Sequence, residues 1–137
     1  MELKKQSLDT WLDNVDYQDL ATGSYVPSTF SIGFMNFIKL VNGVQGESNK
    51  TPPVHLKMLD MLASPSQYVA ILIFRGAAKT TLFMEYLTLY LAVFHELPYL
   101  GEVSGMIYVT DSIENGVKSA RKNIEYRYEN SEFLKEQ

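Results

Sequence analysis

The chain has 137 residues, of which 46% are hydrophobic and 20% charged, with a formal net charge of −4 and no cysteine. This length suits one domain or part of one, and the lack of cysteine excludes a disulfide framework and a thiolate metal site. The acidic balance counts against a stand-alone DNA-binding module, because such modules usually carry a basic patch.

Residues 1–50 are expected to form an N-terminal helical segment. In residues 1–25, apolar side chains and aspartates recur at a spacing that fits one amphipathic helix. That helix packs on the domain or on a partner, or it is a tail with a solvated acidic face. In residues 30–41, aromatic and aliphatic side chains recur every three or four positions, which predicts a helix with one core-facing stripe.

Residues 51–137 alternate between helical and strand patterns after a polar loop rich in Gly, Asn and Pro. Two strands and the helices around them predict one right-handed βαβ unit of a parallel sheet. The fold class expected is therefore α/β, with flanking helices and the N-terminal helices before it. Its elements are a helix at 54–62, a strand at 69–74, a helix at 80–96, a strand at 106–109 and a helix after Asp111 and Ser112. Either Asp111 or Ser112 caps that last helix, or it lines a ligand crevice at the strand end.

Between the first strand and its helix lies a turn of small residues that ends in Lys79, Thr80 and Thr81. The order of strand, small-residue turn, Lys-Thr and helix is typical of a phosphate-binding P-loop (Walker A motif). Small side chains let backbone N–H groups approach phosphate oxygens, and the helix N-terminus adds free donors. Lys79 would reach the β- and γ-phosphates of ATP, and the Thr80 hydroxyl would be a ligand of Mg²⁺.

The spacing of this turn departs from the general pattern G-x-x-x-x-G-K-[ST]. The two glycines of that pattern would fall at Ile73 and Ala78, whereas this chain has only Gly76, off the register. The alternative without a ligand is an ordinary strand, turn and buried helix, in which Arg75 and Lys79 are merely solvated. Two cations inside a turn between strongly apolar elements favour the phosphate site.

At Phe74-Arg-Gly-Ala-Ala-Lys-Thr80 the chain resembles the large terminase subunits of tailed bacteriophages, above all those of short-tailed phages with the loop Phe-Arg-Gly-x-Gly-Lys-Ser. The resemblance covers roughly residues 28–137 at the level of patterns. It implies that Arg75 senses or stabilises the γ-phosphate as an arginine finger supplied in cis; the alternative is phosphate or carboxylate pairing without catalysis. It also implies that the methyl group of Ala78, where the family has Gly, weakens nucleotide binding.

The same resemblance places His55 where many terminases have a glutamine that reads adenine. A histidine side chain cannot make both hydrogen bonds of that glutamine, so a structural or solvated role is the alternative. The residues predicted to hold the nucleotide are Arg75, Gly76, Ala77, Ala78, Lys79, Thr80, Thr81 and His55.

The family resemblance implies an ATP-driven motor that moves double-stranded DNA into a procapsid and cuts it. Its partners would be the portal protein and the small terminase subunit, in a ring of subunits in the host cytoplasm. A Walker-B carboxylate, a catalytic glutamate and a nuclease metal cluster would follow a third strand, and no such run occurs before Gln137. We therefore expect a soluble N-terminal segment that does not hydrolyse ATP efficiently by itself, with no signal peptide and no bilayer-spanning stretch.

Two other functions remain open. The chain is either part of another P-loop ATPase, such as a helicase-like protein, or a non-catalytic remnant that acts as an interaction module through its N-terminal helices. A nucleotide-dependent change in stability would separate the last possibility from the other two.

Overall fold

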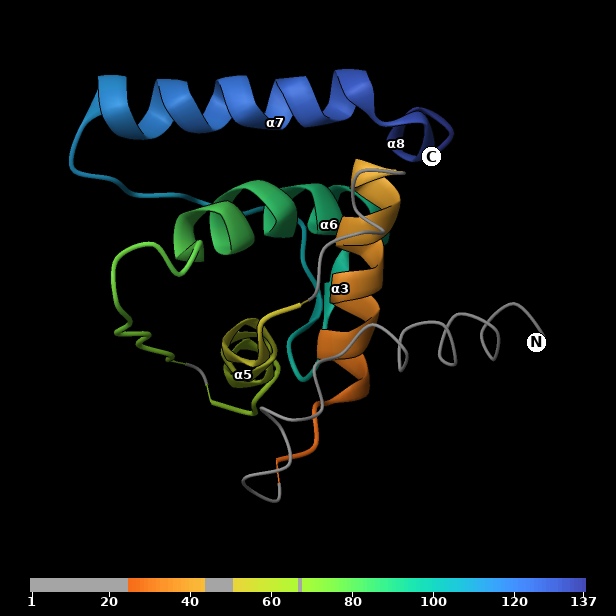
Figure 1. Ribbon diagram of the computed structural model, residues 1–137, viewed down its shortest axis with the longest axis vertical. Coiled ribbons are helices and arrows are strands. Elements are labelled where there is room, and N and C mark those ends of the chain that lie inside the picture. The colour runs from red at the N-terminus through yellow and green to blue at the C-terminus, as the bar shows by residue number, and fades with distance from the viewer. Residues whose placement is uncertain (1–24, 44–50, 67) are drawn as a thin grey trace.

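The computed structural model describes residues 25–43, 51–66 and 68–137 (Figure 1). Helices make up 59% of these residues, so helix packing rather than a sheet organises the fold. The α-helices are α3 (Thr29–Asn42), α5 (Pro53–Leu62), α6 (Leu87–Phe94), α7 (Ser119–Asn130) and α8 (Glu132–Lys135), and the π-helices η1 (Thr81–Tyr86) and η2 (Ile113–Lys118) lead directly into α6 and α7.

Local signals in the sequence explain where the helices begin and end. The Ser28 side chain accepts a hydrogen bond from the Ser31 N–H at 3.1 Å and caps α3. Pro53 opens α5, where its fixed φ suits the first helical turn. The predicted cap before the last long helix is confirmed at Ser112, whose side chain accepts from the Asn115 N–H at 3.2 Å.

The helix after the loop ends earlier than predicted. It stops at Phe94 because His95 takes a left-handed conformation with φ of 55°. The next residues form the short antiparallel hairpin of β1 (Glu96–Leu97) and β2 (Gly101–Glu102), with Glu96 opposite Glu102.

A single apolar core joins the two predicted segments of the chain. Phe34 of α3 and Leu56 and Leu59 of α5 are fully buried in it, together with apolar side chains of η1, α6 and α8. In Figure 1, α7 lies along η1 and α6, α5 lies on the opposite side of them, and α3 crosses near their end. The predicted core-facing stripe of residues 30–41 is thus confirmed.

The predicted parallel sheet is wrong. Residues 69–74 and 106–109 run without helix or strand assignment, and β1 and β2 are the only strands in the described part of the chain. Ile71 and Ile73 pack against the core, but Leu72 between them is 99% exposed. A strand is stabilised by the hydrogen bonds of its neighbours in a ladder. An apolar run alone supplies no such neighbour, so the βαβ unit does not form here.

The second predicted strand is even less buried than the first. Ile107 is 91% exposed and Val109 is 84% exposed. Exposed apolar side chains along an extended, unpaired segment are typical of surfaces that associate with other chains. Neither run therefore forms the strand that its composition predicts.

Two other expectations concern the N-terminal region and membrane-spanning helices. The predicted amphipathic helix in residues 1–25 lies almost wholly outside the described residues, as does most of the polar loop before α5. Among the described residues, no helix is both long enough and apolar enough to cross a membrane.

Candidate functional site

The loop at residues 75–80 has an unusual backbone for its composition. Gly76 has φ of 93°, and Ala78 has φ of 54° although it carries a side chain. The left-handed region costs an L-residue roughly 1–2 kcal/mol, so surrounding contacts must hold Ala78 there. The side chain of Ala77 is only 5% exposed, and its burial anchors the loop.

Three backbone donors of the loop have no backbone partner in the part of the chain that the structure describes. They are the N–H groups of Ala78, Lys79 and Thr80. The carbonyl oxygen of Ala78 accepts from the Leu82 N–H at 2.9 Å, which starts the helix directly after the loop. The loop therefore ends in a helix N-terminus with free N–H groups, an arrangement that favours anions.

The predicted phosphate-binding side chains lie around one small hollow. A cavity of about 380 Å³ is lined by residues 73–80, which include Arg75, Lys79 and Thr80. These three residues are exposed. The structure thus brings two cations and one hydroxyl to the same loop cavity, an arrangement that can bind a phosphorylated ligand with an attached cation.

His55 lies beside the loop although 22 positions separate it from Ala77. Its Nε2 atom is 3.0 Å from the carbonyl oxygen of Ala77. Because a carbonyl oxygen only accepts, Nε2 must carry the hydrogen and donate it. The ring nitrogen that reaches farthest is therefore engaged by the loop backbone, and only Nδ1 is left to contact a base.

Helix α5 holds His55 in a fixed place. Its Asp60 accepts a hydrogen bond from the Ser28 N–H at 3.0 Å and another from the Tyr25 hydroxyl, which ties α5 to the start of α3. Burial alone would raise the pKa of Asp60, but these hydrogen bonds stabilise the carboxylate and bring the pKa below its usual value.

A second hollow lies against the same loop. This cavity of about 190 Å³ includes His55, Ala78 and Thr81 in its wall, and α3 supplies the opposite side with Met35 and Asn42. Ala78 borders both hollows, so the loop separates them. Thr81 faces this second hollow, whereas Thr80 lies at the first.

An ion pair between η1 and α7, with a buried carboxylate and a partly buried guanidinium, was missed by sequence reasoning. Glu85 of η1 is 4% exposed, and its carboxylate lies 2.8 Å from Arg127 Nη2 of α7. Asn123 donates to the same carboxylate at 2.9 Å. Arg127 also stacks on the Tyr86 ring at 4.2 Å, and the Tyr86 hydroxyl donates to Asn42 at 2.9 Å. The only hint in the sequence is a lone glutamate in an otherwise apolar helix.

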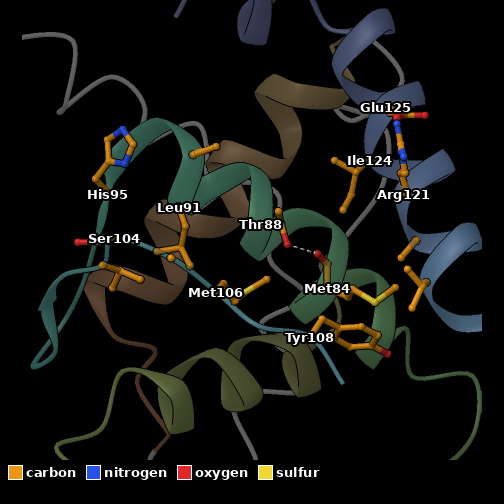
Figure 2. Close-up of a pocket in the computed structure, with 15 residues that line it drawn as sticks. Met84, Thr88, Leu91, His95, Ser104, Met106, Tyr108, Arg121, Ile124 and Glu125 are labelled. Carbon is orange, nitrogen blue, oxygen red and sulfur yellow. Dashed lines mark hydrogen bonds and ion pairs between the residues drawn. The ribbon is translucent and has the colours of Figure 1, made fainter. Parts of the chain in front are cut away.

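A larger cavity of about 610 Å³ lies between η1 and α6, the segment after β2, and α7 (Figure 2). Met84, Leu91, Met106 and Ile124 point into it in Figure 2, and the Arg121–Glu125 ion pair of 2.7 Å lies on its α7 side. The lining is mainly apolar, and its His95 and Ser104 make no hydrogen bond with each other in the described chain. This cavity offers space for apolar groups rather than a reaction centre.

No metal cluster accompanies the loop: in residues 25–43, 51–66 and 68–137, no three His, Asp or Glu side chains are placed to hold a metal ion. A Mg²⁺ ion bound mainly by phosphates, waters and one hydroxyl needs no such cluster. The chain was also compared with models of protein families, with curated proteins and with solved structures, and no match was found in any of the three.

Proposed function

We propose that the loop at residues 75–80 binds the triphosphate of ATP together with Mg²⁺. The observation that carries the proposal is the free N–H groups of the loop beside a cavity bordered by Arg75, Lys79 and Thr80. Backbone donors, two cations and a hydroxyl at the start of a helix are the groups that bind nucleotide phosphates elsewhere in proteins.

The residues from Arg75 to Thr81 have the following roles in this proposal. Lys79 contacts the β- and γ-phosphates, and the Thr80 hydroxyl is a Mg²⁺ ligand. Arg75 neutralises charge on the γ-phosphate. Residues 76–78 supply backbone N–H groups. Thr81 faces the second hollow and is therefore a poorer candidate than Thr80 for the Mg²⁺ ligand.

The wider function follows from the family resemblance of residues 74–80. We propose that the chain is an N-terminal, ATP-binding segment of a phage terminase large subunit, the motor that packages viral DNA. Double-stranded DNA, the portal protein and the small terminase subunit are then its partners, in the host cytoplasm. A helicase-like ATPase is the alternative within the same class, and a Walker-B carboxylate with its coupling motif in the complete gene would distinguish them.

A second candidate function is an interaction module without nucleotide. It is favoured by the exposed apolar runs around Leu72 and Ile107, which suit contact with another chain. This function requires no ligand at the loop, so the two candidates predict different responses to Mg·ATP.

The first test is thermal unfolding with and without millimolar Mg·ATP. We expect the wild-type melting temperature to rise, because ligand at 100 times its dissociation constant stabilises the folded state by about 2.7 kcal/mol. The Lys79→Ala variant should show no rise, whereas Lys122→Ala on the exposed side of α7 should behave as wild type. A folded wild type that does not respond to Mg·ATP would reject the nucleotide proposal in favour of the interaction module.

The Ala78→Gly variant should bind Mg·ATP more tightly. Glycine adopts φ of 54° without strain and removes a methyl group beside the free N–H groups. We expect the dissociation constant to fall about three- to tenfold, equivalent to roughly 1 kcal/mol, in isothermal titration calorimetry. Ala77→Gly is the matched control, since Ala77 is buried and lacks a positive φ. Equal tightening in both variants would contradict this explanation.

A further inference from the structure

One contact to the loop comes from outside it and has no role in the proposed binding of phosphates. His55 of α5 donates from Nε2 to the carbonyl oxygen of Ala77, at 3.0 Å. That carbonyl belongs to the peptide unit that joins Ala77 to Ala78, the residue with the left-handed backbone. The hydrogen bond therefore acts on the most strained part of the loop.

The orientation of this peptide unit decides where one loop donor points. No cis peptide bond occurs in the described residues, and in a trans peptide the C=O and N–H groups point in opposite directions. With the Ala77 carbonyl turned to His55, the Ala78 N–H is turned away from α5. His55 borders the second hollow and does not border the cavity of residues 73–80.

The position of His55 is itself rigid. Its own N–H donates to the Pro52 carbonyl at 3.0 Å, in the first turn of α5. The next residue, Leu56, is fully buried in the core, as is Leu59 one turn later. The imidazole thus extends from a helix that the core and Asp60 hold in place, and it can fix the more exposed loop.

We propose that His55 is a positioning residue for phosphate binding. By holding the Ala77 carbonyl, it keeps the Ala78 N–H directed at the phosphate cavity and keeps Ala78 in its left-handed conformation. This inference rests on the proposed function of the loop. It differs from a role in reading adenine, because its effect reaches the phosphates alone and is the same for every base.

The test measures binding of Mg·ATP, Mg·GTP and inorganic tripolyphosphate with Mg²⁺ by calorimetry. We expect His55→Ala to weaken binding of all three compounds by a similar factor of about 10 to 100. This is the range for loss of one hydrogen bond to a charged group, here the bond from the Ala78 N–H to the phosphate. Tripolyphosphate carries no base and no sugar, so it isolates the effect on the loop.

Two further variants keep the test valid if His55→Ala loses its fold. A Gln side chain places its Nε2 at the same number of bonds from Cβ as the Nε2 of His, while Asn is one carbon shorter. His55→Gln should therefore restore binding of all three compounds, and His55→Asn should not. Thermal unfolding of each variant without ligand provides the check on folding.

The outcomes separate this inference from the function on which it rests. A wild type that binds none of the three compounds overturns the proposed function and the positioning role with it. A wild type that binds, with His55→Asn or His55→Ala unchanged, overturns the positioning role alone. Loss of Mg·ATP binding with unchanged tripolyphosphate binding also overturns it, in favour of contact with the base.

Discussion

Replacing Arg127 by alanine should destabilise the protein by about 3–5 kcal/mol, because the buried carboxylate of Glu85 then loses its partner. Arg127 is also stacked on Tyr86, so the substitution removes packing as well as charge. Urea unfolding monitored by circular dichroism measures the change in the free energy of unfolding.

The matched control lies on the same helix. Arg121 pairs with Glu125 at 2.7 Å, but both side chains are largely exposed, so Arg121→Ala should leave the unfolding midpoint nearly unchanged. The double variant Glu85→Met/Arg127→Met should recover most of the stability, since apolar replacement of a buried ion pair is often neutral or stabilising. Similar losses in Arg121→Ala and Arg127→Ala would contradict the importance of burial.

Replacing Phe34 by alanine should also cost about 3–5 kcal/mol. Phe34 has no exposed surface, and its ring contacts Tyr90 at a centroid distance of 5.0 Å and Phe37 at 6.1 Å. The substitution leaves a cavity where α3 meets α6 and removes these aromatic contacts. The same urea titration gives the loss in the free energy of unfolding.

Leu40 is the control for this prediction. It lies on the same helix but is 55% exposed, so Leu40→Ala should change the free energy of unfolding by no more than about 0.5 kcal/mol. Equal losses in the free energy of unfolding for Phe34→Ala and Leu40→Ala would contradict the conclusion that the buried stripe of α3 stabilises the fold.

The helices could be predicted from the sequence because their signals are local. The apolar stripe of α3, the prolines before α5 and the cap at Ser112 each act within a few residues of their own position. The order of loop, Lys79, Thr80 and helix was likewise readable, since a turn and a helix start are defined by neighbouring residues. Whether this loop binds phosphate stays a prediction.

The sheet could not be predicted correctly because strand pairing depends on residues far away in the sequence. Residues 69–74 and 106–109 have the composition of strands, but composition does not provide the partner whose backbone completes the ladder. In the described chain each run lacks that partner, and Leu72 and Ile107 remain in solvent. The fold is therefore helical with one short hairpin, and not the α/β fold expected.

The sequence by itself determined the helix boundaries at local caps, the small-residue loop and the cations within it. Only the tertiary structure decided which distant groups meet: His55 with the Ala77 carbonyl across 22 positions, and Arg127 with Glu85 across 42. A helical period states which face of a helix is apolar, but the partner of a buried polar group depends on how helices pack. Packing of α5 against the loop and of α7 against η1, rather than any motif, therefore brings these distant groups together.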